Sequence, residues 1–175
     1  MSKKERITLE LDGHEVGFSS PGRVIFPERG HTKLDLWKYY DAVADACLGH
    51  LRDRPTTMKR FKEGAAGDFF FQKRVPAHAP DWIEQMTLSF PSGRSANFLV
   101  CQDEAHLAWA LNLGVIDWNP WPVRRPDGDH PDELRVDLDP TPESSFAEAR
   151  AVALCVNEVL EEHDLTGFPK TSGSR

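Results

Sequence analysis

Two runs of alternating apolar and polar residues open the chain. Ile7-Thr8-Leu9-Glu10-Leu11 alternates, Asp12-Gly13 follows, and the second run is His14-Glu15-Val16-Gly17-Phe18. An Asp-Gly pair between two such runs is typical of a tight β-hairpin. The pattern therefore predicts a hairpin over residues 7–18. A loop with several proline and glycine residues then extends to Gly30.

Three segments carry the apolar spacing of an amphipathic helix, and each follows a residue that can cap a helix. The first helix is expected over residues 33–51, with Thr32 as its cap. The second follows the cap Asp103 and ends at about Leu113, and the third follows the cap Ser145 and runs from Phe146 to Leu160. Thr32 and Ser145 each have an acidic residue three positions later, which is the spacing of a capping box. The sequence therefore predicts three helices with defined starts.

Shorter apolar, β-branched and aromatic runs between turn residues predict strands. They are expected over residues 56–61, 69–73, 83–90, 96–101, 115–118, 134–139 and 168–171. This mixture of hairpins and helices predicts an α+β fold. We expect two lobes, an N-terminal one over residues 1–132 and the start of a second over residues 133–175. The strand–helix–strand unit of the second lobe lacks the further strands needed to cover both faces of its helix-packed sheet, so we expect that lobe to be incomplete.

The composition, with 39% hydrophobic and 28% charged residues in a chain of 175, is ordinary for a globular protein. No apolar run approaches the ~20 residues that span a membrane, and no apolar stretch follows the basic N-terminus as in a secretory signal. We therefore expect a cytoplasmic protein.

Cys47, Cys101 and Cys155 each fall in an apolar pattern, which predicts buried free thiols. The spacing of the histidines does not indicate a zinc site.

The charge is unevenly distributed along the chain. The net charge is −7, yet residues 1–75 carry +3 and residues 76–175 carry −10. Such asymmetry fits a basic groove for a phosphate backbone that faces a carboxylate site. The alternative is a polar surface without a binding role.

Asp137 and Asp139 are the strongest candidates for metal ligands. In a strand they point to one side, roughly 6–7 Å apart, while Val136 and Leu138 point to the other. Hard cations such as Mg²⁺ or Mn²⁺ take carboxylate oxygens as ligands. The alternative is a strand end with two solvated aspartates.

Basic and aromatic residues alternate within the expected hairpin of residues 54–74. Basic side chains contact phosphates, and aromatic faces stack on bases. The three phenylalanines at 69–71 must point both ways in a strand, so the alternative is that they are largely core.

Arg23 and Lys33 flank a turn before a helix N-terminus, where free N–H groups favour anions. The loop over residues 169–174 can hold phosphate oxygens with its amides, or it is an ordinary turn.

A set of motifs in a fixed order resembles one known family. They are SSPGRVIFP, TK-x-x-x-x-x-YY, RP-x-T-x-KR, F-x-QKR-x-P-x-x-x-PDW, LAWA-x-NLG, NPWP, DELRVDLDP and FPKTSG. Together they resemble the polymerase domain of bacterial ligase D and its stand-alone relatives, the primase-polymerases of the archaeo-eukaryotic primase superfamily. The resemblance covers essentially the whole chain and implies a two-lobed primase-like fold, of which residues 133–175 begin the catalytic lobe.

The resemblance implies a role for particular residues. Asp137 and Asp139 match catalytic, metal-binding carboxylates of two-metal nucleotidyl transfer, with Mn²⁺ or Mg²⁺ as cofactor. The matches in the other sites are Ser20, Arg23 and Lys33 for the DNA 5′-phosphate; Lys59, Asn119, Ser172 and Arg175 for the nucleotide; and Phe70 and Phe71 for template stacking. Two of these positions depart from the family's pattern, because Ser20 replaces an Asn and Asn119 replaces a His.

The resemblance implies that the family's third metal-binding aspartate lies in a continuation beyond Arg175. Two metals normally need several carboxylates, so we expect weaker binding of at least one metal by Asp137 and Asp139 alone.

The resemblance predicts a template-dependent DNA or RNA nucleotidyltransferase for gap filling and end joining. Its implied partners are gapped or broken double-stranded DNA with a 5′-phosphate, NTP or dNTP, a DNA ligase and a Ku-type end-binding protein, at the nucleoid in the cytoplasm. One alternative is a non-catalytic module that binds DNA ends. Another is a metal-dependent nuclease, because two aspartates and a basic groove do not fix the reaction.

Overall fold

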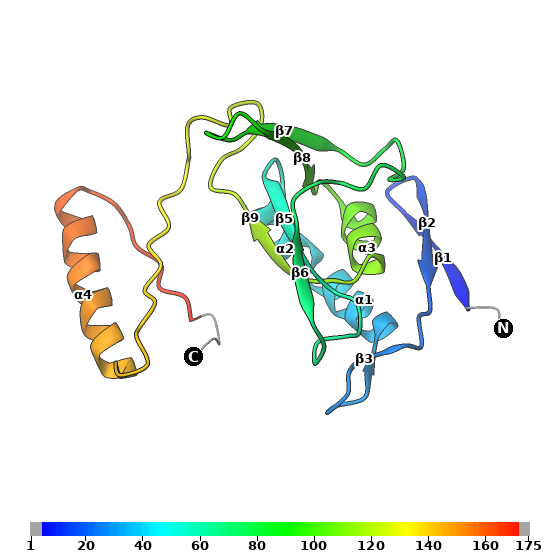
Figure 1. Cartoon of the computed structure of the whole chain (residues 1–175), viewed down its shortest axis with the longest axis horizontal. Coiled ribbons are helices and arrows are strands. Elements are labelled where there is room, and N and C mark those ends of the chain that lie inside the picture. The colour runs from blue at the N-terminus through cyan, green and yellow to red at the C-terminus, as the bar shows by residue number, and fades with distance from the viewer. Residues whose placement is uncertain (1–4, 172–175) are drawn as a thin grey trace. The chain divides into compact units, whose positions relative to one another are not determined.

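The structure is a computed structural model that describes residues 5–171 (Figure 1). The chain divides into two compact units, Met1–Leu134 and Arg135–Arg175, called unit 1 and unit 2 below. Unit 1 contains antiparallel sheets and three helices, and unit 2 contains a fourth helix. The predicted α+β fold class is confirmed.

The N-terminal hairpin forms as expected from strands β1 (Arg6–Leu11) and β2 (His14–Ser19), with Leu11 opposite His14. Asp12 and Gly13 both have positive φ, 48° and 78°, as a two-residue hairpin turn of the type I′ class requires. The inward residues of β2, Val16 and Phe18, are buried in the main core. The alternating pattern of the sequence therefore places one face of this hairpin inward.

Two short strands and two helices follow the hairpin. β3 (Val24–Phe26) pairs with β4 (His31–Thr32), and Thr32 then caps α1 (Lys33–Ala42) through the predicted capping box. The single helix expected over residues 33–51 is wrong, because the helical path breaks at Val43 and α2 (Ala44–Leu51) starts there. The break allows both segments to bury apolar residues: Leu36 and Trp37 from α1, and Leu48 and Leu51 from α2.

A five-stranded antiparallel sheet forms the centre of unit 1. Its strands are β5 (Pro55–Phe61), β6 (Phe69–Gln72), β7 (Gln85–Ser89), β8 (Ser95–Val100) and β9 (Val115–Pro120). β5 pairs with β9 along one edge and with β6 and β8 along the other. Each of these strands was predicted from the sequence, with boundaries that differ by a few residues.

The main core lies between the helices and one face of this sheet. α3 (Glu104–Asn112) begins at the predicted cap Asp103 and is buried on all sides from Ala105 to Leu111. Its residues pack in one cluster with the apolar residues of α1 and α2 and with Met58, Leu99 and Val115 of the sheet. The sheet face that carries Met58 is therefore the covered face. The alternate residues of β5, including Lys59, point to the opposite face.

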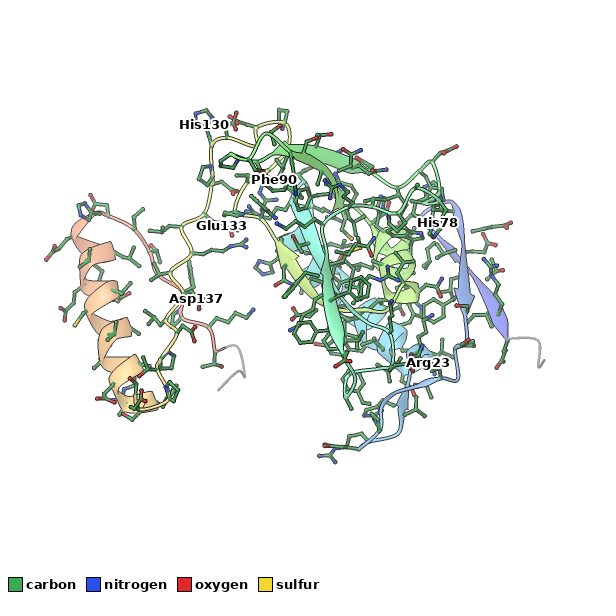
Figure 2. The ribbon with its side chains drawn as sticks, viewed as in Figure 1. Arg23, His78, Phe90, His130, Glu133 and Asp137 are labelled. Atoms are coloured by element: carbon green, nitrogen blue, oxygen red, sulfur yellow. The ribbon has the colours of Figure 1, made fainter. Side chains whose placement is uncertain are left out.

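A second, smaller apolar cluster lies at one end of the sheet. It consists of Leu88, Ala96 and Phe98 with Met86, Phe90 and Trp121 around them; Figure 2 labels Phe90. The indole N–H of Trp121 donates to the Thr57 hydroxyl at 3.3 Å, and the Trp121 ring meets Phe98 edge-on at 5.4 Å. This cluster fastens the start of the irregular segment after β9 onto the sheet.

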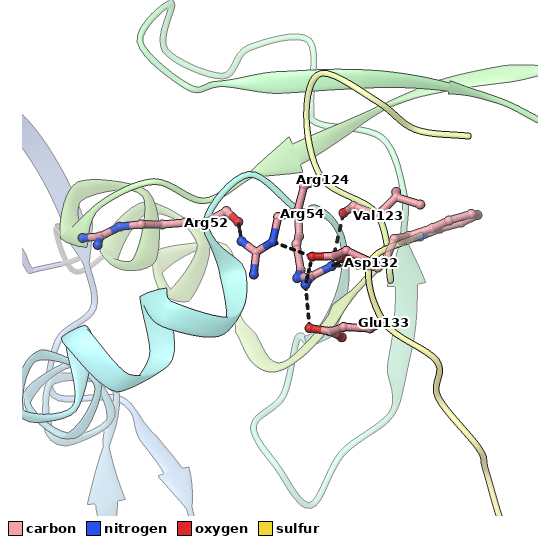
Figure 3. Close-up of polar contacts among 7 residues, drawn as sticks. Arg52, Arg54, Val123, Arg124, Asp132 and Glu133 are labelled. Atoms are coloured by element: carbon pink, nitrogen blue, oxygen red, sulfur yellow. Dashed lines mark hydrogen bonds and ion pairs between the residues drawn. The ribbon is translucent and has the colours of Figure 1, made fainter. Parts of the chain in front are cut away.

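Arg54 anchors the end of the same segment (Figure 3). Its side chain is only 1% exposed, and its guanidinium donates to both oxygens of Asp132 at 2.6 and 2.8 Å and to Glu133 at 2.5 Å. Arg124 adds a bond to Asp132 at 2.9 Å. Because a buried charge is costly unless it is paired, this double pairing explains how Arg54 can be buried. No sequence pattern predicted this anchor.

Unit 2 consists of an irregular segment, α4 (Phe146–Glu162) and a short irregular end. The predicted capping box of Ser145 and Glu148 is confirmed. The strands expected over residues 134–139 and 168–171 are wrong, because both stretches are irregular. A strand needs a neighbour for its backbone hydrogen bonds, and the described part of unit 2 contains no sheet.

The apolar face of α4 is exposed. None of its residues is buried, and the exposed apolar side chains of unit 2 include Val136, Phe146, Val152, Leu154, Val159, Leu165 and Phe168.

The prediction of three buried thiols is correct for Cys101, but Cys47 is half-buried and Cys155, on α4, is exposed. Within residues 5–171, no helix is both long enough and apolar enough to cross a membrane.

Candidate nucleic-acid interface

Four basic residues line one pocket of unit 1, called the basic pocket below. Its volume is about 210 Å³, and its lining contains Arg23, Lys33, Arg60 and Lys62 but no acidic residue. Arg23 precedes β3, Lys33 begins α1, and Arg60 and Lys62 come from the end of β5 and the turn after it. The structure therefore brings together Arg23 and Lys33, which the sequence predicted as phosphate ligands, and adds two further cations.

Lys33 is the buried cation of the pocket, with a side chain that is 7% exposed. Its ammonium group donates to the Ser19 carbonyl at 2.8 Å and to both oxygens of Asn112, at 2.7 Å (Oδ1) and 3.0 Å (carbonyl). Burial, and secondarily the charge of Arg23, lowers the pKa of Lys33 to about 8. The ammonium group of Lys33 is therefore held in position by neutral oxygens rather than by a carboxylate.

Arg23 and Arg60 differ in how firmly contacts with other groups hold their side chains in place. Arg23, labelled in Figure 2, donates to the Lys62 carbonyl and lies 3.8 Å from the exposed carboxylate of Glu63. Arg60 donates to the Leu113 carbonyl at 2.8 Å and to the Gln72 side chain, and burial lowers its pKa. Arg23 is half-exposed and can turn toward a ligand, whereas Arg60 is held in place.

Ser20 occupies a turn beside this pocket. Its backbone has a positive φ of 51°, and its carbonyl accepts the N–H of Arg23 at 3.1 Å. Ser20 does not line the basic pocket. Its carbonyl instead stabilises the turn that carries Arg23.

The face of the sheet opposite the main core, called the open sheet face below, carries Lys59, Phe71 and Asn119 of the sequence-predicted residues, together with their neighbours. Strand alternation and register place these residues on it: Thr57, Lys59 and Phe61 of β5, Phe69 and Phe71 of β6, and Asp117 and Asn119 of β9. Lys59 pairs with Asp117 at 3.2 Å. The side-chain nitrogen of Asn119 is buried and has no hydrogen-bond partner in the described part of the chain.

Phe70 and Phe71, predicted together as template-stacking residues, lie on opposite faces of β6. Phe71 is exposed on the open sheet face, whereas Phe70 lies opposite Arg60 on the covered face. The ring of Phe70 is 5.2 Å from the Arg60 guanidinium and 5.1 Å from the Lys62 ammonium, both of which line the basic pocket. The structure thus places Phe70 with the basic pocket and Phe71 with Lys59 and Asn119.

Asp137, labelled in Figure 2, and Asp139 lie in the irregular segment of unit 2 that precedes α4. Both are exposed, and residues 5–171 contain no group of three or more His, Cys, Asp or Glu side chains that could hold a metal ion. Their oxygens are the donors that Mg²⁺ and Mn²⁺ prefer, so the donor chemistry fits one such ion, while a full set for two ions is absent from the described residues. Ser172 and Arg175 lie outside the described residues.

Sequence reasoning missed Arg60, Lys62 and Phe69. Alternation along β5 sends Arg60 to the side of Met58 and away from Lys59, but it cannot reveal that β3 and α1 bring Arg23 and Lys33 to the same place. Phe69 shares the exposed side with Phe71 because their positions differ by two, and this spacing was a usable signal.

Comparison with known proteins gives one consistent result. Residues 32–175 match the family model described as LigD, primase-polymerase domain. The chain is 32% identical over 190 residues to the multifunctional non-homologous end joining DNA repair protein LigD of Mycobacterium tuberculosis, covering 99% of this chain and 23% of the relative. It is also 32% identical to the bifunctional non-homologous end joining protein LigD of Bacillus subtilis, covering 90% of this chain and 25% of the relative.

The likeness extends to three dimensions. The polymerase domain of M. tuberculosis ligase D, solved in complex with DNA, matches with a TM-score of 0.76 and 29% identity over 90% of this chain and 57% of that domain chain. The chain thus spans about a quarter of the curated relatives and little more than half of the solved domain. The family match covers most of the chain, and the sequence and structural matches agree. The chain belongs to the LigD primase-polymerase domain family.

Proposed function

We propose that this chain acts in template-dependent nucleotidyl transfer during DNA end joining and gap filling, and that unit 1 holds the 5′-phosphorylated end of the DNA. The observation that carries the proposal is the basic pocket, where four cations line one small cavity without an acidic residue. Gapped or broken DNA with NTP or dNTP are the substrates in this proposal. A DNA ligase and a Ku-type protein are the partners, at the nucleoid in the cytoplasm.

A terminal phosphate suits the pocket better than a phosphate within a strand. A phosphate monoester carries about −1.5 to −2 charges near pH 7, whereas an internal phosphate carries one. Lys33 is a buried cation whose lowered pKa reflects burial and the nearby charge of Arg23. A dianion beside it would offset both effects, and Arg23 offers a half-exposed guanidinium for a bidentate contact.

The open sheet face is the proposed position of the nucleotide and the template. Lys59 provides a positive charge, and the unpartnered amide nitrogen of Asn119 provides a donor for a phosphate or sugar oxygen. Phe71 provides an exposed ring for a base. Ser172 and Arg175 are proposed as further contacts to the nucleotide.

Asp137 and Asp139 are the residues that would hold Mg²⁺ or Mn²⁺. A bound divalent ion there would stabilise the negative charge that develops on phosphate oxygens during nucleotidyl transfer. In this proposal the residues of unit 1 bind the DNA end and the template without a metal ion. DNA binding can therefore be measured in the absence of metal.

The binding half of the proposal is tested with fluorescently labelled gapped DNA that carries either a 5′-phosphate or a 5′-hydroxyl at the gap. We expect the phosphorylated DNA to bind about 10-fold more tightly, because charge-assisted contacts contribute about 1.5–3 kcal/mol each and part of this is screened by salt. Arg23→Ala should remove most of the difference. Lys38→Ala is the matched control, because Lys38 is an exposed cation on the same helix as Lys33 but outside the pocket. Equal affinity for the two DNAs would overturn the pocket assignment.

The catalytic half is tested by primer extension with Mn²⁺ on the same gapped DNA. Asp137→Ala and Asp139→Ala should abolish extension while leaving the affinity for the DNA end unchanged, because the basic pocket belongs to unit 1. Product length separates the polymerase from a nuclease, since a nuclease shortens the labelled primer. Extension by Asp137→Ala at the wild-type rate would contradict the metal assignment.

A second candidate is a DNA-end-binding module without catalysis. It is favoured by Asp137 and Asp139, which belong to no group of three or more metal-ligating side chains within the described residues. In that case wild-type protein would prefer the 5′-phosphorylated gap but extend no primer at any Mn²⁺ concentration.

A further inference from the structure

The three consecutive phenylalanines of β6 divide between the two faces of the sheet. Phe69 and Phe71 are 51% and 56% exposed on the open sheet face, while Phe70 lies with the cations of the basic pocket. The neighbour of Phe71 in space is therefore Phe69, although Phe70 adjoins it in sequence. Single soluble domains rarely leave several large rings together in water unless the patch is used.

The rings of Phe69 and Phe71 form a corner. Their centroids are 5.7 Å apart and their planes meet at 81°. The ammonium of Lys59 lies 4.3 Å from the Phe69 centroid, and Phe61 supports the same ring from 5.6 Å. Because the two ring planes are nearly perpendicular, a flat ligand stacked on the Phe71 ring meets Phe69 in an edge-to-face arrangement. Aromatic rings favour both of these contacts, the offset stack and the edge-to-face arrangement.

The chemistry of the corner fits an unpaired nucleobase. A base offers a flat π surface for Phe71 and an edge for Phe69, and the phosphate attached to it is drawn to the nearby Lys59. An apolar peptide would gain from the rings but not from the cation, whereas single-stranded DNA gains from both. Within duplex DNA the bases are stacked on each other, so a flat contact of this kind requires a base that is unpaired.

We infer that Phe69 is a nucleobase-binding residue, and that Phe69 and Phe71, rather than Phe70 and Phe71, form the stacking corner for single-stranded DNA. The inference rests on the proposed function and refines which side chains read the unpaired strand. Phe70 contributes instead through Arg60 and Lys62 of the basic pocket. A substitution at position 70 and one at position 69 should therefore change different parts of the DNA affinity.

The test compares three labelled 5′-phosphorylated duplexes by fluorescence anisotropy: one blunt, one with a short single-stranded tail, and one with the same tail made abasic. The ratio of the blunt to the tailed Kd measures what the tail contributes. For wild type we expect a ratio of about 10, because stacking of one base corresponds to roughly 5–150-fold in affinity. The abasic tail keeps its backbone phosphates but lacks bases. Its ratio should therefore fall to the part of the tail's contribution that comes from phosphate contacts.

Phe71→Ala should remove most of the tail contribution, and Phe69→Ala should reduce it by about 2–10-fold, the range for an edge-to-face contact. Phe70→Ala should leave the ratio unchanged, whatever it does to the affinity for the blunt duplex. Tyr39→Ala is the matched control for the loss of an exposed ring, because Tyr39 lies on α1 away from the sheet. Phe69→Leu, which keeps an apolar side chain in the strand, should lower the ratio without lowering the unfolding midpoint.

Three results are decisive. A ratio that falls with Phe69→Ala on the normal tail but not on the abasic tail supports the inference. A ratio that Phe70→Ala lowers and Phe69→Ala does not would overturn it and leave the proposed function intact. Failure of the wild-type protein to bind any of the DNAs would overturn the proposed function and the inference together.

Discussion

Helix α1 in unit 1 and helix α4 in unit 2 begin in the same way but have different surroundings. Each starts with a hydroxyl residue and an acidic residue in a complete capping box. α1 buries Leu36 and Trp37 in the main core, whereas α4, the longer helix, buries no residue. Local signals therefore suffice to start a helix in this chain, and the difference between the two units comes from what each helix has to pack against.

The largest effect should come from removing a ring in the core of unit 1. Phe18→Ala should cost about 3–5 kcal/mol of unfolding free energy, because Phe18 is fully buried and the cavity cannot close completely. Phe146→Ala in unit 2, where the ring is 74% exposed, should change it by less than about 0.5 kcal/mol. Urea unfolding followed by tryptophan fluorescence reports the stability of unit 1 for both variants, because all five tryptophans lie in unit 1.

Equal losses for the two variants would contradict the comparison. They would mean that the ring of Phe146 is covered in solution and that unit 2 unfolds together with unit 1. A Phe18→Leu variant checks that the loss follows buried volume, since it should recover more than half of the stability.

The next effect concerns Arg54, which ties the last part of unit 1 to the sheet. Arg54→Met should cost about 2–3 kcal/mol, because it removes hydrogen bonds to two charged groups and leaves Asp132 and Glu133 without this partner. The cost stays below that of a wholly buried pair because water can reach both carboxylates. Arg124→Met is the matched control, and its more exposed guanidinium should cost at most about 1 kcal/mol. Arg54→Met as mild as Arg124→Met would show that the anchor adds little.

The same anchor predicts a dependence of stability on pH. The hydrogen bonds from Arg54, followed by those from Arg124, lower the pKa of Asp132 to about 2. A carboxyl whose folded pKa is depressed stabilises the fold above its unfolded pKa, near 4, and that contribution is lost as the pH falls toward 2. Because the side chain is 43% exposed, the contribution is on the order of 1 kcal/mol. Asp132→Asn should flatten the stability of unit 1 between pH 4 and 2, and an unchanged slope would contradict the assignment.

Much of unit 1 could be predicted from local patterns, because its signals are short in range. The Asp12-Gly13 turn, the caps Thr32 and Asp103, and the alternation of β5 each depend on neighbours in sequence. The break at Val43 could not be predicted from the apolar spacing, because that spacing continues through it. It reflects the packing of two helices that each bury their own residues in the core.

Apart from Phe69, whose spacing from Phe71 was a local signal, the remaining errors and omissions mostly concern long-range partners. The D-x-D stretch was predicted as a strand from its alternation, but no neighbouring strand in the described residues completes its hydrogen bonds. The burial of Lys33 and Arg54 depends on acceptors at Asn112 and Asp132, which are 78 or more positions away. The motifs indicated the family, and strand alternation alone separates Phe70 from Phe71. The register of β6 against β5 was needed to show that Phe70 lies opposite Arg60 and Phe71 opposite Lys59.

The smallest predicted effect compares the two capping boxes directly. Thr32→Ala should lower the unfolding free energy of unit 1 by about 1 kcal/mol, because the first turn of α1 loses a side-chain acceptor. Ser145→Ala removes the same contact from α4, but the tryptophan-monitored transition should not move, since α4 contributes nothing to the core that the tryptophans report. Its effect should instead appear in far-UV circular dichroism as a loss of helicity, because an unpacked helix of this length depends on its ends.

Acid should reproduce this contrast without mutation. Hydrogen bonding to the backbone N–H of Ser145 lowers the pKa of Glu148, as the N–H of Thr32 does for Asp35, so each box is complete above the unfolded pKa of its carboxyl, near 4, and weakens as the pH falls below it. Between pH 5 and 3 helicity from α4 should fall in wild type and remain flat in Glu148→Gln, whose amide keeps an acceptor for the Ser145 N–H. α1 should stay folded over the same range because its buried face, and not its cap, holds it. If α1 and α4 instead lost helicity together, burial would not be what separates the two units, and the apolar face of α4 would have to be packed in solution.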